Sequence, residues 1–199
     1  MTIKLIGSSS GSVSLQAPAT TTGGANRVIT LPDRDQTGLG RILQVVNAIK
    51  TDTASTTGDT FVDISGLSIS ITPSSSSNKI LFRGYVAMGT QLNGTGTLKI
   101  FRDSTEIGKS TADGTAANNS TANIKVLNAG ATTTSGRSQI WQLQFEVLDS
   151  PNTTSATTYK CQFAETHINA TVYVNRSYTG TDADHHGAIS SITAMEVAA

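Results

Sequence analysis

The chain has 199 residues, a formal net charge of zero and only 14% charged residues. This length suffices for one ordinary domain with a small additional segment. Without an excess of basic residues the chain cannot neutralise many phosphates, which excludes nucleic acid as its main partner. Ser and Thr make up about a quarter of the chain and Val and Ile are frequent, a composition that favours a β-sheet protein over a disordered one.

No stretch of the sequence approaches the length of a membrane span, so we expect no membrane insertion. Residues 1–7 lack the apolar run of a secretory signal. The single Cys161 cannot form an internal disulfide. We therefore expect a protein that is made in a cytoplasm and folds without an oxidising compartment.

Residues 1–40 differ in pattern from the remainder. Short apolar alternations of about four residues are separated by Ser- and Gly-rich stretches at 8–12 and 20–25, and strands of this length cannot bury a core alone. We predict that 1–40 is an attachment or stalk segment. A flexible joint at 38–40 would connect it to a distal domain, residues 41–199.

From residue 42 onward the apolar residues alternate in short runs. Residues 42–50 suit either a helix or a strand, and the Thr-rich stretch that follows without a cap favours a strand. Residues 61–64 and 67–71 are predicted to pair across Ser65-Gly66, and 79–88 to form a strand with apolar residues on both faces. A tight hairpin is expected at 98–110.

The stretch 138–165 carries the only Trp and two of the five Phe residues. Alternation from Trp141 to Val147 and from Tyr159 to Phe163 predicts two strands, which we interpret as one long hairpin that centres the core. A last strand is expected at 189–197. Some nine or ten short strands without a long helix predict an all-β fold, an antiparallel jelly-roll-like β-sandwich.

Few residues suggest chemistry. Cys161 lies on the apolar row of a strand and is interpreted as a buried, inert thiol. Asp182-Ala183-Asp184-His185-His186 is the densest group of potential metal ligands, but its spacing matches no zinc signature and its Gly-rich flanks suit a solvated turn. No nucleophile, base and orienting group are brought together by the sequence, so we predict neither catalysis nor a metal or cofactor.

Binding is expected in loops, because loops on a rigid sandwich vary without disturbing the core. Tyr173 and Tyr178 flank residues 174–177, where a Tyr and an Arg could stack on and hydrogen-bond a sugar. The loop 176–187 also contains the densest group of chemically versatile side chains in the sequence. Its candidate receptor-binding residues are Arg176, Tyr178, Asp182, Asp184, His185 and His186. A solvated loop without a binding role is the alternative, with Tyr173 packed on its strand.

Several stretches of the sequence resemble fibre proteins of tailed bacteriophages, marine ones especially. QVVNAIKTDTASTTGDTFVDISGLSISI at 44–71, LDSPNTTSATTYKCQFAE at 148–165, VYVNRSY at 172–178 and SSITAMEVAA at 190–199 resemble the terminal domain of such fibres. SGSVSLQAPATTTGGANRVITLPD at 10–33 is similar to their attachment and stalk repeat. The resemblance covers nearly the whole chain, and its motifs are turns and strand starts.

The resemblance implies a homotrimeric virion protein with its N-terminus on the particle and its distal domain exposed. Residues 1–40 would contact a tail adaptor, a baseplate or the capsid, and the distal domain a polysaccharide or protein of the host surface. Because only one stalk-like repeat is present, a short tail fibre or spike is expected. The alternatives are a capsid decoration or head fibre without receptor binding, and a carbohydrate-binding module.

Overall fold

A computed structural model describes residues 2–6, 12–16, 41–91, 94–110, 122–125, 139–167, 169–178 and 187–199. Every regular element in these ranges is a β-strand, and none of the described residues forms a helix that could cross a membrane. The chain divides into two units, Met1–Thr37 and Gly38–Ala199. In the first unit β1 (Thr2–Ile6) pairs antiparallel with β2 (Ser12–Gln16). The attachment role of 1–40 and the boundary to 41–199 stay predictions.

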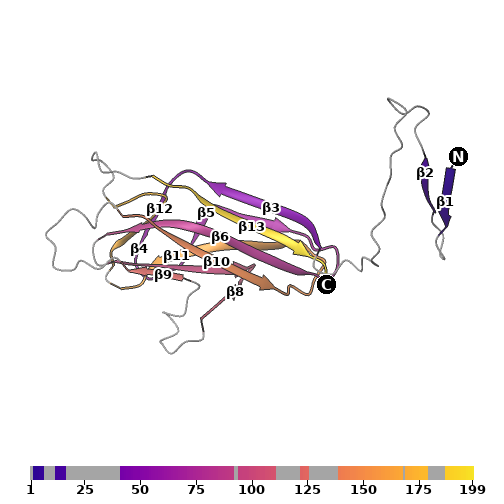
Figure 1. Cartoon of the computed structure of the whole chain (residues 1–199). Helices are drawn as coiled ribbons and strands as arrows, with labels where there is room; N and C mark the ends of the chain where they lie inside the picture. The colour runs from indigo at the N-terminus through magenta and orange to yellow at the C-terminus, as the bar shows by residue number, and fades with distance from the viewer. Residues whose placement is uncertain are drawn as a thin grey trace, which may run out of the picture. The chain divides into compact units, whose positions relative to one another are not determined.

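The first sheet of the second unit is organised around β6. Its six strands are β3 (Ile42–Lys50), β4 (Ala54–Thr57), β6 (Lys79–Thr90), β10 (Trp141–Asp149), β12 (Thr171–Val174) and β13 (Ser190–Val197). Strand β10 pairs with one side of β6, while β13 and then β12 pair with the other side. Since β13 also pairs with β3 and β12 with β4, the six strands form four rows (Figure 1).

The second sheet contains β5 (Val62–Ile71), β7 (Thr95–Arg102), β8 (Thr105–Ile107), β9 (Ala122–Lys125) and β11 (Thr157–Glu165). Strand β11 lies between β5 and β7, and the far side of β7 pairs with both β8 and β9. These five strands therefore also form four rows.

The order of the rows defines the fold. Three rows contain two strands each: β3 with β4, β8 with β9, and β12 with β13. When the rows are numbered in chain order, their order across the first sheet is 1-8-3-6 and across the second 2-7-4-5. Every pairing is antiparallel. This is the order of a jelly roll. The prediction of an all-β antiparallel jelly-roll sandwich is confirmed.

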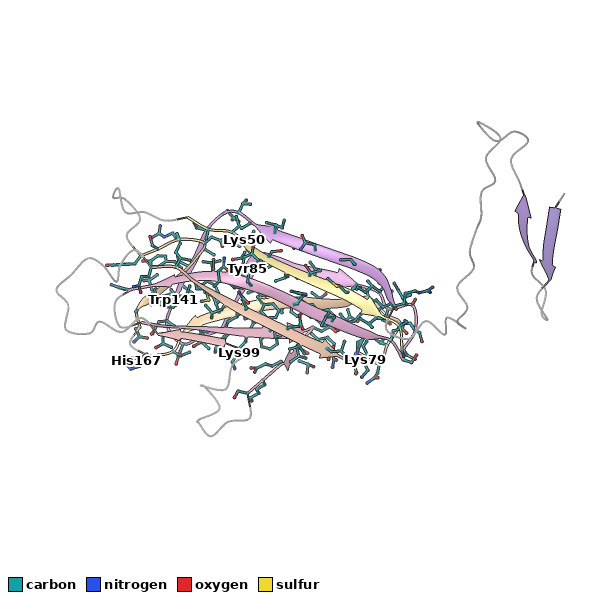
Figure 2. All side chains as sticks on the ribbon, in the orientation of Figure 1. Lys50, Lys79, Tyr85, Lys99, Trp141 and His167 are labelled. Carbon is teal, nitrogen blue, oxygen red and sulfur yellow. The ribbon has the colours of Figure 1, made fainter. Side chains whose placement is uncertain are left out.

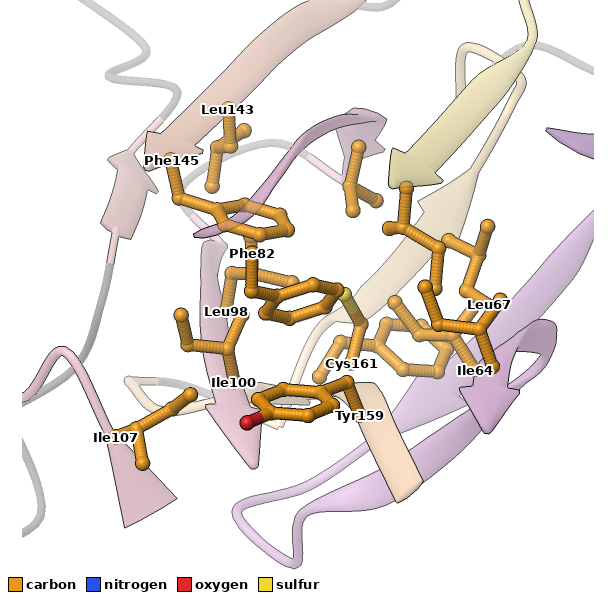
Figure 3. Packing of buried hydrophobic residues seen from close by; sticks show 14 of the residues in the cluster. Ile64, Leu67, Phe82, Leu98, Ile100, Ile107, Leu143, Phe145, Tyr159 and Cys161 are labelled. Atoms are coloured by element: carbon orange, nitrogen blue, oxygen red, sulfur yellow. The ribbon is translucent and has the colours of Figure 1, made fainter. Parts of the chain in front are cut away.

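The core lies between the two sheets. The Phe82 ring of β6 lies 5.1 Å from the Phe145 ring of β10 and 5.2 Å from the Tyr159 ring of β11, so one aromatic row connects the sheets (Figure 3). Cys161 is completely buried beside them, and burial raises the pKa of its thiol. A neutral, enclosed thiol agrees with the interpretation of Cys161 as inert.

The predicted hairpin at 138–165 is wrong. Strand β10 pairs with β6 in the first sheet and β11 with β5 and β7 in the second, so the link from Ser150 to Ala156 crosses from one sheet to the other. Period two identifies which face of a strand is apolar, and both strands do turn that face to the core. It does not identify the neighbouring strand.

Of the other strand predictions, the one for residues 61–71 is wrong and two are confirmed. Residues 61–71 do not form two paired strands, because β5 is one strand. Asp63 is paired with Gln162 of β11 and Ser68 with Lys160. Between these two pairs β5 advances by five residues and β11 by two, so β5 has extra residues that bulge from the ladder. Gly66, at φ 86°, allows this bulge, which places both Ile64 and Leu67 in the core. The strand over 42–50 and the hairpin of β7 with β8 are confirmed.

Candidate functional site

The loop predicted to bind a receptor begins where β12 ends. Strands β12 and β13 form one row beside β6, and the loop lies between these two strands in the chain. An isolated backbone bridge between Arg176 and Gly187 closes the base of this loop. The row structure therefore fixes both ends of the loop on the first sheet.

Asn175 holds the start of the loop. Its backbone is left-handed, at φ 62°, and its side-chain Nδ2 donates to the carbonyl oxygens of Lys50 (2.9 Å) and Asp52 (2.8 Å). Its Oδ1 accepts from the Ser190 hydroxyl at 2.6 Å. The buried side-chain amide of Asn175 thus connects the segment between β3 and β4 with the segment between β12 and β13. Asn adopts this backbone conformation more readily than most residues.

Two of the six predicted receptor-binding residues lie in described parts of the chain. The Arg176 guanidinium carbon lies 4.3 Å from the centre of the Tyr173 ring, and the Tyr173 and Tyr178 rings are 6.1 Å apart. Arg176 and Tyr173 line a shallow pocket of about 190 Å³ together with residues 53–55. Asp182, Asp184, His185 and His186 lie outside the described residues.

The structure brings Arg176, Tyr173 and Tyr178 together; from the sequence, Tyr173 was either part of a sugar-stacking group with Arg176 and Tyr178 or a packed strand residue. All three are partly buried. The stacking of Arg176 on Tyr173 is of the cation–π type, which holds a guanidinium in place without an acid. Nothing in this arrangement supplies a nucleophile with a base. Among the described residues no group of three or more His, Cys, Asp or Glu side chains is placed to hold a metal ion.

A larger hollow lies on the solvent face of the first sheet and was not predicted. It has a volume of about 500 Å³ and is lined by residues of β6, β10 and β13: Arg83, Gly84, Tyr85, Gln144, Phe145, Glu146, Ser191 and Thr193. We call it the sheet groove. Tyr85 marks its position in Figure 2. The sequence signal was weak, because its side chains come from strands that are far apart in the chain.

The register of the strands arranges the groove side chains in two cross-rows. Tyr85 of β6 lies opposite Gln144 of β10 on one side and Ser191 of β13 on the other. One step along, Arg83 lies between Glu146 and Thr193 in the same way. Directly opposed side chains on one face of an antiparallel sheet are neighbours.

The next cross-row along this face is apolar. Leu81 of β6 lies between Leu148 of β10 and Met195 of β13, and Met195 is opposite Val45 of β3. Val45 is 56% and Leu148 53% exposed, at the two edges of the sheet. We call these four residues the apolar row. Large apolar side chains arranged across a whole sheet face are a feature of contact surfaces.

Comparison with known proteins adds little to this picture. No protein-family model and no curated protein matches the chain. Among solved structures, a chain from infectious bursal disease virus of the Gt strain is 15% identical with a TM-score of 0.37, and the match covers 96% of this chain and 46% of that one. A chain of the VP2 subviral particle of infectious bursal disease virus is 14% identical with a TM-score of 0.39, over 94% of this chain and 42% of that one.

The chain therefore spans less than half the length of these viral chains. Identities this low relate folds only. The jelly-roll assignment rests on the strand order described above.

Proposed function

We propose that the chain is a structural protein of a virion, in which residues 1–40 attach to another virion protein and residues 41–199 form an exposed domain. Within that class, a short tail fibre or spike that contacts the host surface is the function we favour. The observation that supports this most is the division of the chain into a small N-terminal unit and a complete jelly roll. Attachment to the particle and contact with the host are then assigned to different parts of one chain.

The proposed assembly is a homotrimer. The apolar row is the surface that supports self-association, because Val45 and Leu148 are more than half exposed and lie in one cross-row with Leu81 and Met195. A formal net charge of zero removes overall repulsion between copies.

The proposed host contact is the loop that begins at Arg176. Arg176 stacked on Tyr173, with Tyr178 nearby, presents a guanidinium and two aromatic rings from a fixed strand end. Arg and Tyr are frequent anchors of binding surfaces. Asp182, Asp184, His185 and His186 belong to the same proposal on the strength of the sequence alone.

Antibodies against the distal domain test the proposal on virus particles. If the chain is a tail fibre or spike, the antibodies label the tail and reduce adsorption of the particles to host cells. Label spread over the head without an effect on adsorption would support a capsid decoration instead. Absence of the chain from particles would leave a carbohydrate-binding module of a cellular protein, the last of the three alternatives.

A further inference from the structure

The sheet groove combines polar groups of several kinds with a single aromatic ring. Tyr85 is partly buried and Gln144 is exposed, and neither side chain makes a hydrogen bond to another described residue. Both are therefore available to a ligand. A phenol and a primary amide at neighbouring positions offer a ring surface, donors and acceptors together.

The hydroxyl side of the groove is oriented by Asn47 of β3. Its Nδ2 lies within hydrogen-bond distance of Thr193 Oγ1 (2.9 Å), Ser191 Oγ (3.1 Å) and the Ile192 carbonyl oxygen (2.9 Å), and it shares its two protons among these three acceptors. A hydroxyl that accepts one hydrogen bond still carries its own proton to donate. Ser191 and Thr193 are thus held in position while keeping a donor for a ligand.

The charged pair of the groove is held loosely. Arg83 Nη1 and Glu146 Oε2 are 3.5 Å apart, and the two side chains are 54% and 58% exposed. Exposed pairs at this distance contribute little to stability and can separate at small cost. Together they supply donors and acceptors without a net charge, which disfavours a strongly anionic or cationic ligand.

The groove lies on the face of the sheet and not at an edge. The backbone groups of β6 and β13 are paired on both sides, so a peptide could add a strand only along the outer side of β10 and not across the centre of the groove. Adjacent rows are about 4.8 Å apart and alternate residues about 7 Å, so the two cross-rows cover an area about 10 Å by 7 Å. The volume of about 500 Å³ is typical of small-molecule sites.

We propose that the sheet groove binds an uncharged saccharide of one or two rings. Tyr85 would contact the apolar face of a sugar ring, and Gln144, Ser191, Thr193 and the Arg83–Glu146 pair would bond its hydroxyl groups. The lining of the groove shares no residue with the pocket beside Arg176. The inference therefore goes beyond the proposed function and does not depend on where the chain resides.

The test is a titration of the full-length protein with maltose, cellobiose and lactose, followed by NMR of the Gln144 side-chain amide in the wild type and of the Ser191 and Thr193 backbone amides in the wild type and all variants. Titration to about 10 mM detects sites with dissociation constants near 1 mM. We expect a saturable shift with at least one of the three sugars. Sodium glucuronate serves as the charged counterpart and should bind more weakly than the best neutral sugar.

Two variants separate the groove from the remainder of the sheet. Gln144→Ala removes one amide from the groove and should weaken binding up to about tenfold, the effect of one net hydrogen bond. Gln142→Ala alters the same exposed row of β10 outside the groove lining and should leave binding unchanged. Both positions are exposed, so we expect both variants to fold.

Three results would overturn the inference: no shift with any of the three sugars, equal effects of the two variants, or tighter binding of glucuronate. A fourth is a dilution series in which the Gln144 resonances shift without sugar. That result would identify the groove as a contact between copies of the chain.

Discussion

Glu196 shows how a buried carboxylate is stabilised in this fold. It is 1% exposed, and its two oxygens accept hydrogen bonds from Asn78 Nδ2 (2.6 Å), Gln44 Nε2 (2.6 Å), and both the backbone nitrogen and the hydroxyl of Ser74 (2.7 Å each). Burial raises the pKa of Glu196, but these hydrogen bonds outweigh burial and lower the pKa to about 2. The network joins β13 to β3 and to the turn after β5.

The lowered pKa predicts a pH dependence of stability. The contribution of Glu196 is complete above its ordinary pKa of 4.5 and is lost as pH falls toward about 2. Glu196→Gln should therefore flatten the decline of stability in this window and cost about 1–3 kcal/mol at neutral pH. Thermal unfolding at a series of pH values measures both effects. Glu146→Gln, at an exposed pair, is the control, and parallel pH profiles for wild type and Glu196→Gln would contradict the assignment.

Trp141 and Phe145 share one face of β10 but differ in burial. Trp141 is 51% exposed because it is the first residue of the strand, whereas Phe145 is 8% exposed against Phe82. The sequence predicted both side chains to face inward; Trp141 lies on the predicted face of β10, but it is not buried there. Alternation along a strand does not reveal where the opposite sheet ends.

Phe145→Ala should cost about 3–5 kcal/mol of unfolding free energy, the usual range for a buried aromatic. Trp141→Ala should cost about 1 kcal/mol or less, because half of the side chain is already in water. Urea unfolding of the two variants decides between them. Equal losses would mean that Trp141 is covered in the folded protein.

At the scale of elements, the sequence predicted strand positions better than strand partners. Residues 79–88 and 189–197 were expected as strands from their apolar patterns, and 42–50 from the Thr-rich stretch that follows it without a cap; the strands observed are 79–90, 190–197 and 42–50. The pairing of β10 with β6 instead of β11 depends on a link that crosses between sheets, and this link has the same turn residues as a hairpin. The sheet groove was not predicted for the same reason. Its cross-rows exist only once β6, β10 and β13 are paired.

Asn175 connects the ends of several strands, and mutations can test how much its hydrogen bonds stabilise the fold. Asn175→Gly keeps the left-handed backbone and removes the hydrogen bonds to Lys50, Asp52 and Ser190, which should cost about 1–3 kcal/mol. Asn175→Ala loses the same bonds and adds backbone strain, so its cost should be about 1 kcal/mol greater. Urea unfolding measures the difference. A larger loss for the Gly variant would show that the φ of 62° is not maintained in solution.

At the scale of the whole molecule, the two ends of the first sheet's solvent face have opposite character. The sheet groove is polar and contains the Arg83–Glu146 pair, while the neighbouring apolar row contains Val45, Leu81, Leu148 and Met195. A single sheet face can thus serve two purposes, with a ligand at one end and another copy of the chain at the other. The two surfaces can be altered separately, because the variants proposed for them lie on different cross-rows.

Leu148→Lys tests the proposed trimer. Leu148 is 53% exposed at an edge strand, so a charge there should disturb the fold of one copy little. In an interface between copies, the same charge would lose its water without a partner, and we expect the assembly to dissociate. Light scattering on the full-length protein should give three chains for wild type and one for Leu148→Lys. Gln142→Lys, with the same charge on the same strand outside the apolar row, should remain trimeric. A wild-type monomer would reject the trimer, and a Leu148→Lys trimer would move the interface to another face of the molecule.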